Sequence, residues 1–469
     1  MKKIYNLKKI KKIHFVGIGG IGISAIAKMM MKEGKKVSGT DLVISEIAEE
    51  LKAKGAKFYK GHNARYLGKD TDLVIYSPAV PKGNPERKKA RKLKIPELSY
   101  PEVLGILSRG KRTIAVSGTN GKTTTTAFSG LMLEAAGFDP TVIVGSKVKT
   151  FKEGNLRMGK GKYFVVEGCE WRAHMLNLLP YGIVLTNIEE DHLDYYRDLN
   201  HIIKTFEEYI QKLPKDGFLV LNADDPVSRR LKFPNVKVLT YGIKNKAQLV
   251  ARNIKVKKEK QLFDLVRDGK KLGAFSVFVP GRFNIYNALA ASSMALELGV
   301  SVDTIKKVLE GFPGTWRRFE RIGKRGGAQI ILDYAHHPTA IRETIRATKE
   351  FYPKKRILVV FQPHQHSRTK KLFYDFISSF DEADLIILSE IFDVVGREKE
   401  KDRNISSKDL IRELIKRYRD RAIEKKVLYA KDLDETKKLV LKNFKKNDVV
   451  LIMGAGDIYK IGEELVRGD

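Results

Sequence analysis

The chain has 469 residues, 42% of them hydrophobic and 31% charged, which is long enough for about two to four globular domains and argues against disorder. Its net charge of +33 can attract nucleic acid, but the basic residues are spread along the chain with no basic arm and no interleaved aromatic residues. No apolar run approaches the roughly 20 residues that span a bilayer, and the single cysteine excludes an intramolecular disulfide.

The N-terminal segment, residues 1–12, is basic and leads directly into a predicted strand, with no signal-peptide core. A lone cysteine fits a reducing compartment. We therefore expect a cytoplasmic protein that does not bind membranes, as a monomer or weak homodimer. The positive charge is compatible with anionic small-molecule substrates such as nucleotides, and binding of RNA or DNA is the minor alternative.

The first hundred residues alternate strand and helix patterns, with strands expected at 13–16, 36–41 and 73–77 and a helix at 23–33. Such alternation predicts a parallel, doubly wound sheet. Gly17, Gly19 and Gly22 form G-x-G-x-x-G after the first strand, and Asp41 follows at about 20 residues, the spacing typical of a dinucleotide site. Any pyrophosphate can bind at such a helix N-terminus, and a glycine turn needed only for packing is the alternative.

A second unit starts near Arg109 with the sequence S-G-T-N-G-K-T-T-T-T, after a β-branched run and before a helix expected at 127–136. This order predicts a phosphate loop, with Lys122 directed at the outer phosphates of ATP and the Thr123 hydroxyl at magnesium. Val116 stands where a full Walker A motif has glycine, so the loop has the shorter G-x-x-G-K-T form. The alternative is an accidental loop rich in glycine and threonine.

Further strands are expected at 163–166, 183–186 and 217–221, and a helix carrying Asn284 and Asn287 at 283–298. Glu167 and His192 each follow a strand, at the sheet edge where parallel sheets bind ligands, so they are candidate magnesium ligands beside the phosphate loop. For His192 the alternative is a hydrogen-bonded structural histidine. Cys169 has no flanking base and is interpreted as a half-buried thiol without a nucleophilic role.

A third α/β unit follows a hinge-like G-F-P-G at 311–314, with strands expected at 329–332, 357–361, 385–388 and 449–453. Polar clusters follow the first two strands, at 333–338 and 361–369, and predict a second substrate surface; capping and turn chemistry is the alternative. The Arg317–Arg318 pair follows the hinge, where an arginine can reach a γ-phosphate when domains close.

Together these segments resemble the Mur ligase family over nearly the whole chain. The resemblance is carried by F-V-G-I-G-G-I-G-I-S, S-G-T-N-G-K-T-T-T-T, V-V-E-G-C-E-W-R, L-T-N-I-E-E-D-H-L-D-Y-Y, F-N-I-Y-N-A-L-A-A, G-T-W-R-R-F-E, D-Y-A-H-H-P-T, F-Q-P-H and M-G-A-G-D-I. D-Y-A-H-H-P-T and F-Q-P-H are similar to the alanine-adding branch.

The resemblance implies an α/β fold with three domains: a UDP-sugar-binding Rossmann-like domain at 1–108, a central ATP-binding P-loop domain at 109–313 and an amino-acid-binding Rossmann-like domain at 314–469. It also implies an ATP-dependent, amide-forming ligase of peptidoglycan precursor synthesis, with ATP and Mg²⁺ as cofactors. Its small-molecule substrates would be UDP-N-acetylmuramate and L-alanine, joined through an acyl phosphate.

The site residues are implied in the same way. The catalytic set would be Lys122, Glu167, His192 and Arg318. The ATP set would be Gly118, Thr119, Asn120, Gly121, Lys122, Thr123, Thr124, Asn284, Asn287 and Asp333. Magnesium would be held by Thr123, Glu167 and His192. The sugar nucleotide would meet Gly19, Gly20, Ile21, Gly22, His62 and Ser77, and the amino acid would meet Tyr334, His336 and Arg368.

Three positions depart from the alanine-adding pattern: Asn120 and Phe283 replace common histidines, and Gln365 replaces a common arginine. The alternative within the family is a ligase that adds a preformed peptide to the same sugar nucleotide. A folate polyglutamylating ligase, an ATP-gated nucleic-acid-binding protein and an NAD-binding dehydrogenase are more distant alternatives.

Overall fold

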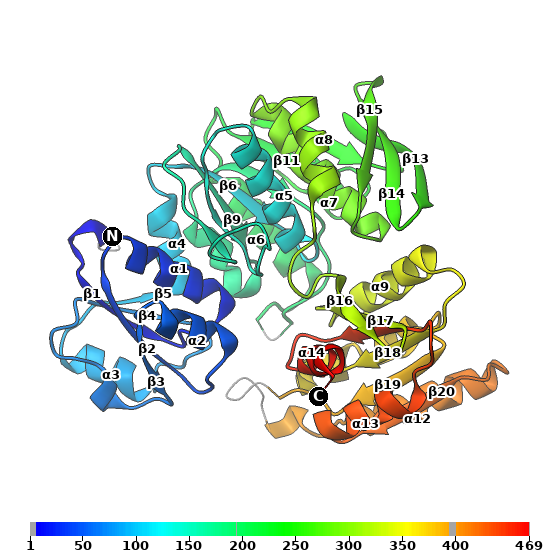
Figure 1. Ribbon diagram of the computed structural model, residues 1–469. Coiled ribbons are helices and arrows are strands. Elements are labelled where there is room, and N and C mark those ends of the chain that lie inside the picture. Colours follow the sequence, from blue (N-terminus) through cyan, green and yellow to red (C-terminus); the bar gives the residue numbers. More distant parts are fainter. Residues whose placement is uncertain (1–5, 194, 394–399, 469) are drawn as a thin grey trace. The chain divides into compact units, whose positions relative to one another are not determined.

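The computed structural model describes residues 6–193, 195–393 and 400–468. The chain divides into two compact units: unit one is Met1–Leu249 with Asn287–Val308, and unit two is Val250–Tyr286 with Leu309–Asp469. The described strands form three sheets, connected largely through helices (Figure 1). The predicted α/β class is thereby confirmed, whereas the domain boundaries at 108 and 313 stay predictions.

The first sheet is parallel throughout, with the strand order β3-β2-β1-β4-β5. Its strands are β1 (Lys12–Val16), β2 (Lys36–Asp41), β3 (Lys57–Lys60), β4 (Leu73–Tyr76) and β5 (Glu97–Ser99). Its helices are α1 (Ile21–Lys32), α2 (Glu46–Ala53), α3 (Pro85–Lys92) and α4 (Tyr100–Ser108), with 3₁₀ turns η1 (Leu7–Lys9) and η2 (Ala64–Tyr66). Ile13 and Phe15 pack with α1 and α4, whereas Val16 packs with Ala90 of α3, so helices cover both faces.

In unit one the second sheet has the order β12-β11-β10-β6-β9-β7-β8, parallel except for the β7–β8 pair. The strands are β6 (Arg112–Ser117), β7 (Thr141–Ile143), β8 (Leu156–Arg157), β9 (Tyr163–Gly168), β10 (Pro180–Leu185), β11 (Phe218–Asn222) and β12 (Lys237–Gly242). The helical segments of this part of the chain are α5 (Lys122–Ala135), η3 (Trp171–Asn177), α6 (Leu199–Ile210) and η4 (Ser228–Arg230). Most of α7 (Arg282–Glu297) and of α8 (Val302–Gly311) also belongs to unit one.

In unit two the third sheet has the order β16-β17-β21-β18-β19-β20, and only the edge strand β16 is antiparallel. The strands are β16 (Glu320–Arg325), β17 (Ala328–Asp333), β18 (Ile357–Phe361), β19 (Leu385–Ser389), β20 (Lys426–Ala430) and β21 (Val449–Met453). The helices are α9 (Pro338–Phe351), α10 (His366–Lys371), α11 (Phe373–Ile377), α12 (Ser407–Asp420), α13 (Leu433–Asn443) and α14 (Tyr459–Arg467), with 3₁₀ turns η5 (Ser378–Phe380) and η6 (Glu400–Asp402). Unit two also contains nearly all of β13 (Leu249–Lys257) together with β14 (Lys260–Arg267) and β15 (Lys270–Val277), the last two forming an antiparallel pair.

Two helix starts differ from the sequence expectation by more than one residue. The helix expected from Ala127 begins at Lys122, and the one expected from Ile23 begins at Ile21. In α5 the residues Thr123–Thr126 are all buried, so tertiary packing outweighs the weak intrinsic helix propensity of threonine.

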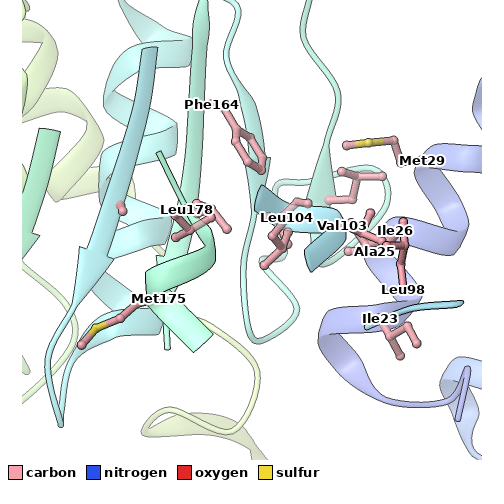
Figure 2. Packing of buried hydrophobic residues seen from close by; sticks show 14 of the residues in the cluster. Ile23, Ala25, Ile26, Met29, Leu98, Val103, Leu104, Phe164, Met175 and Leu178 are labelled. Carbon is pink, nitrogen blue, oxygen red and sulfur yellow. The ribbon is translucent and has the colours of Figure 1, made fainter. Parts of the chain in front are cut away.

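One hydrophobic cluster in unit one runs from α1 through α4 to the second sheet. Figure 2 shows Ile23, Ile26 and Met29 of α1, Val103 and Leu104 of α4, and Met175 and Leu178 at the end of η3. Gly105 of α4 allows close approach, because a Cβ there would lie 2.4 Å from the carbonyl oxygen of Asn177. The first two sheets of unit one therefore share a core.

None of the helices in the described ranges is both long and apolar enough to cross a membrane.

Candidate functional site

The phosphate loop lies between β6 and α5, at the carboxyl end of a strand in the middle of the second sheet. Gly121 is the N-cap of α5 with a φ of 85°, and a Cβ there would lie 2.2 Å from Asn287 Oδ1. Both the backbone conformation and the contact require glycine. The first amides of α5 consequently face outward from a bare glycine turn, as an anion site requires.

The loop is braced by the residues that follow β10. Asn187 accepts from the Thr119 amide through its carbonyl (2.8 Å) and from the Asn120 amide through Oδ1 (3.0 Å). Thr186 Oγ1 donates to the Asn120 carbonyl at 2.6 Å. The T-N-I-E segment thus fixes the loop backbone before any ligand enters.

Lys122 contacts the loop and a carboxylate. Its Nζ donates to the Thr119 carbonyl and to Glu170 Oε1, both at 3.0 Å. Burial is the largest single influence and lowers the pKa of the ammonium, but Glu170, Cys169 and Glu167 together outweigh burial and raise the pKa above its ordinary value. Lys122 is accordingly a fixed positive charge at the mouth of the loop.

Glu170, Asp191 and His192 form a group of three possible metal ligands. His192 Nε2 lies 3.7 Å from both Glu170 Oε1 and Asp191 Oδ2, and His192 has a φ of 53°. The Glu170 side chain is 4% exposed, and its Oε2 is buried without a hydrogen-bond partner among the described residues. An orphaned carboxylate oxygen beside a phosphate loop fits a hard cation such as Mg²⁺.

Glu167 is placed differently from Glu170. Its Oε1 accepts from the Gly145 amide at 2.6 Å, and its side chain lines a cavity of about 210 Å³ together with Tyr100, Cys169 and His174. The rest of the lining is mostly apolar and comes from α1, α4, η3 and the end of β7. The structure therefore brings one predicted carboxylate to a cavity and His192 to another carboxylate that the sequence analysis did not single out.

Cys169 lies between these two glutamates and is half-buried. Burial, with the Glu170 carboxylate second, raises the pKa of the thiol to about 12. The interpretation of Cys169 as a thiol without a nucleophilic role is consistent with this shift.

The glycine turn after β1 lies at the carboxyl edge of the first sheet. The amides of Gly17 and Ile18 donate to the Thr40 carbonyl, and the Gly19 amide donates to Asp41 Oδ2 at 2.9 Å. Gly20 is the N-cap of α1. Ser77 lies against the same turn, because a Cβ on Gly17 would lie 3.0 Å from Ser77 Cβ.

His62 follows β3 at that edge and belongs to a buried polar network. Its Nδ1 lies 2.9 Å from Glu86 Oε1 and 3.0 Å from Thr40 Oγ1. Glu86 Oε2 in turn contacts His14 Nε2 at 2.6 Å and accepts from Thr40 Oγ1 at 2.8 Å. His14 and Glu86 have fully buried side chains.

The two α7 asparagines have different partners. Asn287 Oδ1 accepts from Thr125 Oγ1 of α5 at 3.2 Å, which ties α7 to the phosphate-loop helix. Asn284 Nδ2 donates to the Pro280 carbonyl at 2.7 Å. Both asparagines are buried.

In unit two, the residues predicted to bind the amino acid lie together at the carboxyl ends of β17 and β18. The Tyr334 and His336 rings are 5.2 Å apart, His336 and His364 are 6.1 Å apart, and Arg368 Nη1 lies 3.3 Å from His364 Nδ1. The Arg318 guanidinium lies 4.7 Å from the Tyr334 ring centre.

Asp333 has a structural role in this cluster. Its two oxygens accept from the Phe319 and Ala335 amides, both at 2.7 Å, and hold the turn that carries Arg318. Arg317 lies behind that turn, within 5.4 Å of the rings of Trp316, Tyr334 and Tyr459.

Sequence reasoning did not single out four of these residues: His14, Glu86, Glu170 and Asn187. Glu170 had a detectable signal, since it stands three positions after Glu167 in E-G-C-E. Glu86 also had one, because N-P-E is typical of a helix start, where Asn84 caps α3. His14 and Asn187 acquire their roles only through tertiary contacts.

Sequence models of the Mur ligase family match three successive segments. The "Mur ligase family, catalytic domain" matches residues 12–112, the "Mur ligase middle domain" matches 116–295, and the "Mur ligase, glutamate ligase domain" matches 317–456.

Curated relatives match over nearly the full length. The UDP-N-acetylmuramate–L-alanine ligase of Clostridium novyi is 42% identical, covering 97% of this chain and 96% of the relative. The protein of the same name from Caldanaerobacter subterraneus is 40% identical, covering 98% of both chains.

Solved structures share the fold. The UDP-N-acetylmuramate-alanine ligase MurC from Thermotoga maritima superposes with a TM-score of 0.84 at 30% identity, covering 97% of this chain and 98% of the other. A murein peptide ligase from Psychrobacter arcticus superposes with a TM-score of 0.73 at 23% identity, covering 97% and 98%, a likeness of fold alone.

Proposed function

Because this chain belongs to the Mur ligase family, we propose that it is an ATP-dependent ligase that joins L-alanine to the lactyl carboxylate of UDP-N-acetylmuramate in peptidoglycan precursor synthesis. The observation that carries the proposal is 40–42% identity over nearly the full length to ligases of that name. The peptide-adding alternative has less support, since the murein peptide ligase of Psychrobacter arcticus is only 23% identical.

In the first step, a lactyl carboxylate oxygen attacks the γ-phosphorus of ATP, the bond to the bridging oxygen breaks, and ADP leaves with the electron pair. Lys122 and the amides of the phosphate loop stabilise the charge on the transferring group. The cavity beside Glu167 suits the acyl end of the acceptor, because its mostly apolar lining excludes water from the acyl phosphate.

The residues beside the phosphate loop of unit one fit a bound Mg²⁺ ion. Thr123, Glu167 and His192 remain the proposed ligands, and Glu170 joins them because its orphaned Oε2 is otherwise uncompensated. A bound Mg²⁺ ion would neutralise phosphate charge.

In the second step, the free amine of L-alanine attacks the acyl carbon, loses a proton, and inorganic phosphate leaves with its electron pair. Tyr334, His336 and Arg368 are the residues proposed to bind the amino-acid substrate, and the Arg368 guanidinium would form an ion pair with the alanine carboxylate. For the sugar nucleotide, the α1 N-terminus at Gly20 offers free amides for the diphosphate.

The test is phosphate release from ATP in the presence of UDP-N-acetylmuramate and single amino acids, with product masses measured. We expect release that requires both the sugar nucleotide and L-alanine, and a product heavier by one alanyl residue. Release with a peptide but not with L-alanine would assign the chain to the peptide-adding branch. No stimulation by either would refute the proposal.

A further inference from the structure

The buried network of Glu86, His14, His62 and Thr40 at the first sheet fixes the positions of protons as well as those of side chains. Burial opposes ionisation of Glu86, but hydrogen bonds from His14 and His62 hold the pKa of its carboxyl below the ordinary value. An ionised carboxylate only accepts hydrogen bonds, so each group that contacts Glu86 must present a proton.

Thr40 supplies a second constraint on His62. The single hydroxyl proton of Thr40 is donated to Glu86 Oε2 at 2.8 Å, so Thr40 Oγ1 faces His62 Nδ1 as an acceptor at 3.0 Å. Both neighbours of Nδ1 are therefore acceptors, and Nδ1 must carry the proton. In the neutral ring, Nε2 is left as an acceptor.

The position of His62 in the first sheet indicates which part of a bound nucleotide would lie near Nε2. The glycine turn at the end of β1 is the diphosphate site of the proposed function, and the acidic residue ending β2 is where such folds hold a ribose. His62 follows β3, which is the next strand outward in the order β3-β2-β1. The ring keeps 16% of its side-chain surface exposed. In the proposed binding mode, the nucleoside end of the nucleotide lies on this outer side of the sheet.

We propose that Glu86 is a positioning residue that fixes the Nδ1–H tautomer of His62, so that His62 Nε2 accepts a hydrogen bond from the nucleoside of the sugar nucleotide. The donor is an N–H or O–H group, which in UDP means uracil N3–H or a ribose hydroxyl. The inference rests on the proposed function, because it takes the UDP moiety as the ligand of the first sheet.

The first test is binding of UDP to the full chain by isothermal titration calorimetry, which needs neither ATP nor turnover. In Glu86→Gln the amide oxygen can keep the hydrogen bonds from Thr40 and His14. The NH₂ group then faces His62 Nδ1. We expect His62 to shift its proton to Nε2 and the Kd for UDP to rise about tenfold, as the loss of one hydrogen bond predicts. Glu97→Gln is the matched control, since it loses ion pairs to Arg87 and Arg91 of the same helix but not the contact with His62.

A two-bond ¹⁵N–¹H spectrum of histidine-labelled protein reports the tautomer directly, a change that a purely structural role of Glu86 would not require. His62→Ala avoids the buried positions and should weaken UDP binding equally, with no further loss on adding Glu86→Gln. UDP methylated at N3 should abolish the difference between wild type and variant if uracil is the donor. If a ribose hydroxyl is the donor, 2′-deoxy-UDP or 3′-deoxy-UDP should abolish the difference instead.

Unchanged UDP affinity in Glu86→Gln, an unchanged His62 tautomer, or an undiminished difference with all three analogues would overturn the inference. Failure of the wild-type chain to bind UDP would instead overturn the proposed function, so the two failures are distinguishable.

Discussion

We expect the positive charge of Lys122 to control the rate of the ligation reaction. It lies at the phosphate loop, paired with Glu170 at 3.0 Å. We expect Lys122→Ala to reduce kcat for ATP-dependent ligation about 100- to 1,000-fold, because a preorganised positive charge on the transferring phosphoryl group is lost. Circular dichroism should show a retained fold. Lys215→Ala, an exposed lysine in the same unit, is the control, and near-normal ligation by the Lys122 variant would contradict the assignment.

Arg368 tests the amino-acid end of the reaction. Its guanidinium lies beside His364 in the cluster of unit two. Loss of a charge-assisted contact with the alanine carboxylate in Arg368→Ala should raise the KM for L-alanine about 10- to 100-fold and leave the KM for ATP nearly unchanged. Steady-state kinetics in both substrates measures the split, with Lys370→Ala on the same helix as control. Equal increases in both constants would indicate a structural role.

Cys169 gives a pH-dependent prediction. The folded-state pKa of about 12 exceeds the ordinary value of 9.0, so above pH 9 the unfolded chain holds fewer protons than the folded one. This thiol therefore adds no pH dependence at neutral pH, and above pH 9 it lowers the free energy of unfolding by up to about 1.4 kcal/mol per pH unit. Urea unfolding of wild type and Cys169→Ala between pH 7 and about 10 isolates the effect, since the variant should lack that slope.

The loop between β7 and β8 shows how one element holds another. Asn155 is buried; its Nδ2 donates to the Ile21 carbonyl and to Ser24 Oγ in the first turn of α1, and its Oδ1 accepts from Lys28 Nζ at 3.1 Å. Asn155→Ala should lower the free energy of unfolding by about 1–3 kcal/mol, because buried polar groups lose their partners. Urea titration measures it, and the exposed turn residue Asn63, mutated to alanine, should cost less.

At the same scale, the elements that the sequence predicted best are the buried ones. The strands β2, β18 and β21 have the expected bounds, because parallel strands covered on both faces are continuous apolar runs or end at a turn signal. No strand was expected for β13–β15, whose lysine-rich alternation is exposed along much of its length and gives a weak pattern. The start of α5 was placed too late because the four consecutive threonines have low helix propensity.

The candidate site was predictable where chemistry follows local sequence and unpredictable where it depends on tertiary pairing. The phosphate loop was identified from a contiguous motif. Glu86 and Glu170 were not, since Glu86 acquires its role from His14 and His62, and Glu170 from Lys122 and His192, all distant in the chain. The sequence marks Glu86 and Glu170 only by their local motifs, N-P-E and E-G-C-E, and does not indicate which distant residues they contact.

At the scale of the whole molecule, the net charge of +33 produces a field that attracts anions. We expect the KM values for ATP and UDP-N-acetylmuramate to rise several-fold between about 0.05 and 0.3 M NaCl, because the Debye length shortens over that range. The KM for zwitterionic L-alanine should stay nearly constant and serves as the internal control. Salt-sensitive retention on DNA, without amino-acid-stimulated phosphate release, would favour the nucleic-acid alternative.

The hydrophobic cluster that runs from α1 through α4 to η3 also limits how this chain can be recombined with its relatives. A crossover between α4 and β6 would join a foreign α4 to the native 171–178 segment, across a contact where Gly105 leaves no room for a methyl group. The region of the first sheet therefore cannot be exchanged between relatives independently of residues 171–178. Functional recombinants should inherit α4 and residues 171–178 from the same parent. Their crossover points should therefore lie in surface loops and not between α4 and β6.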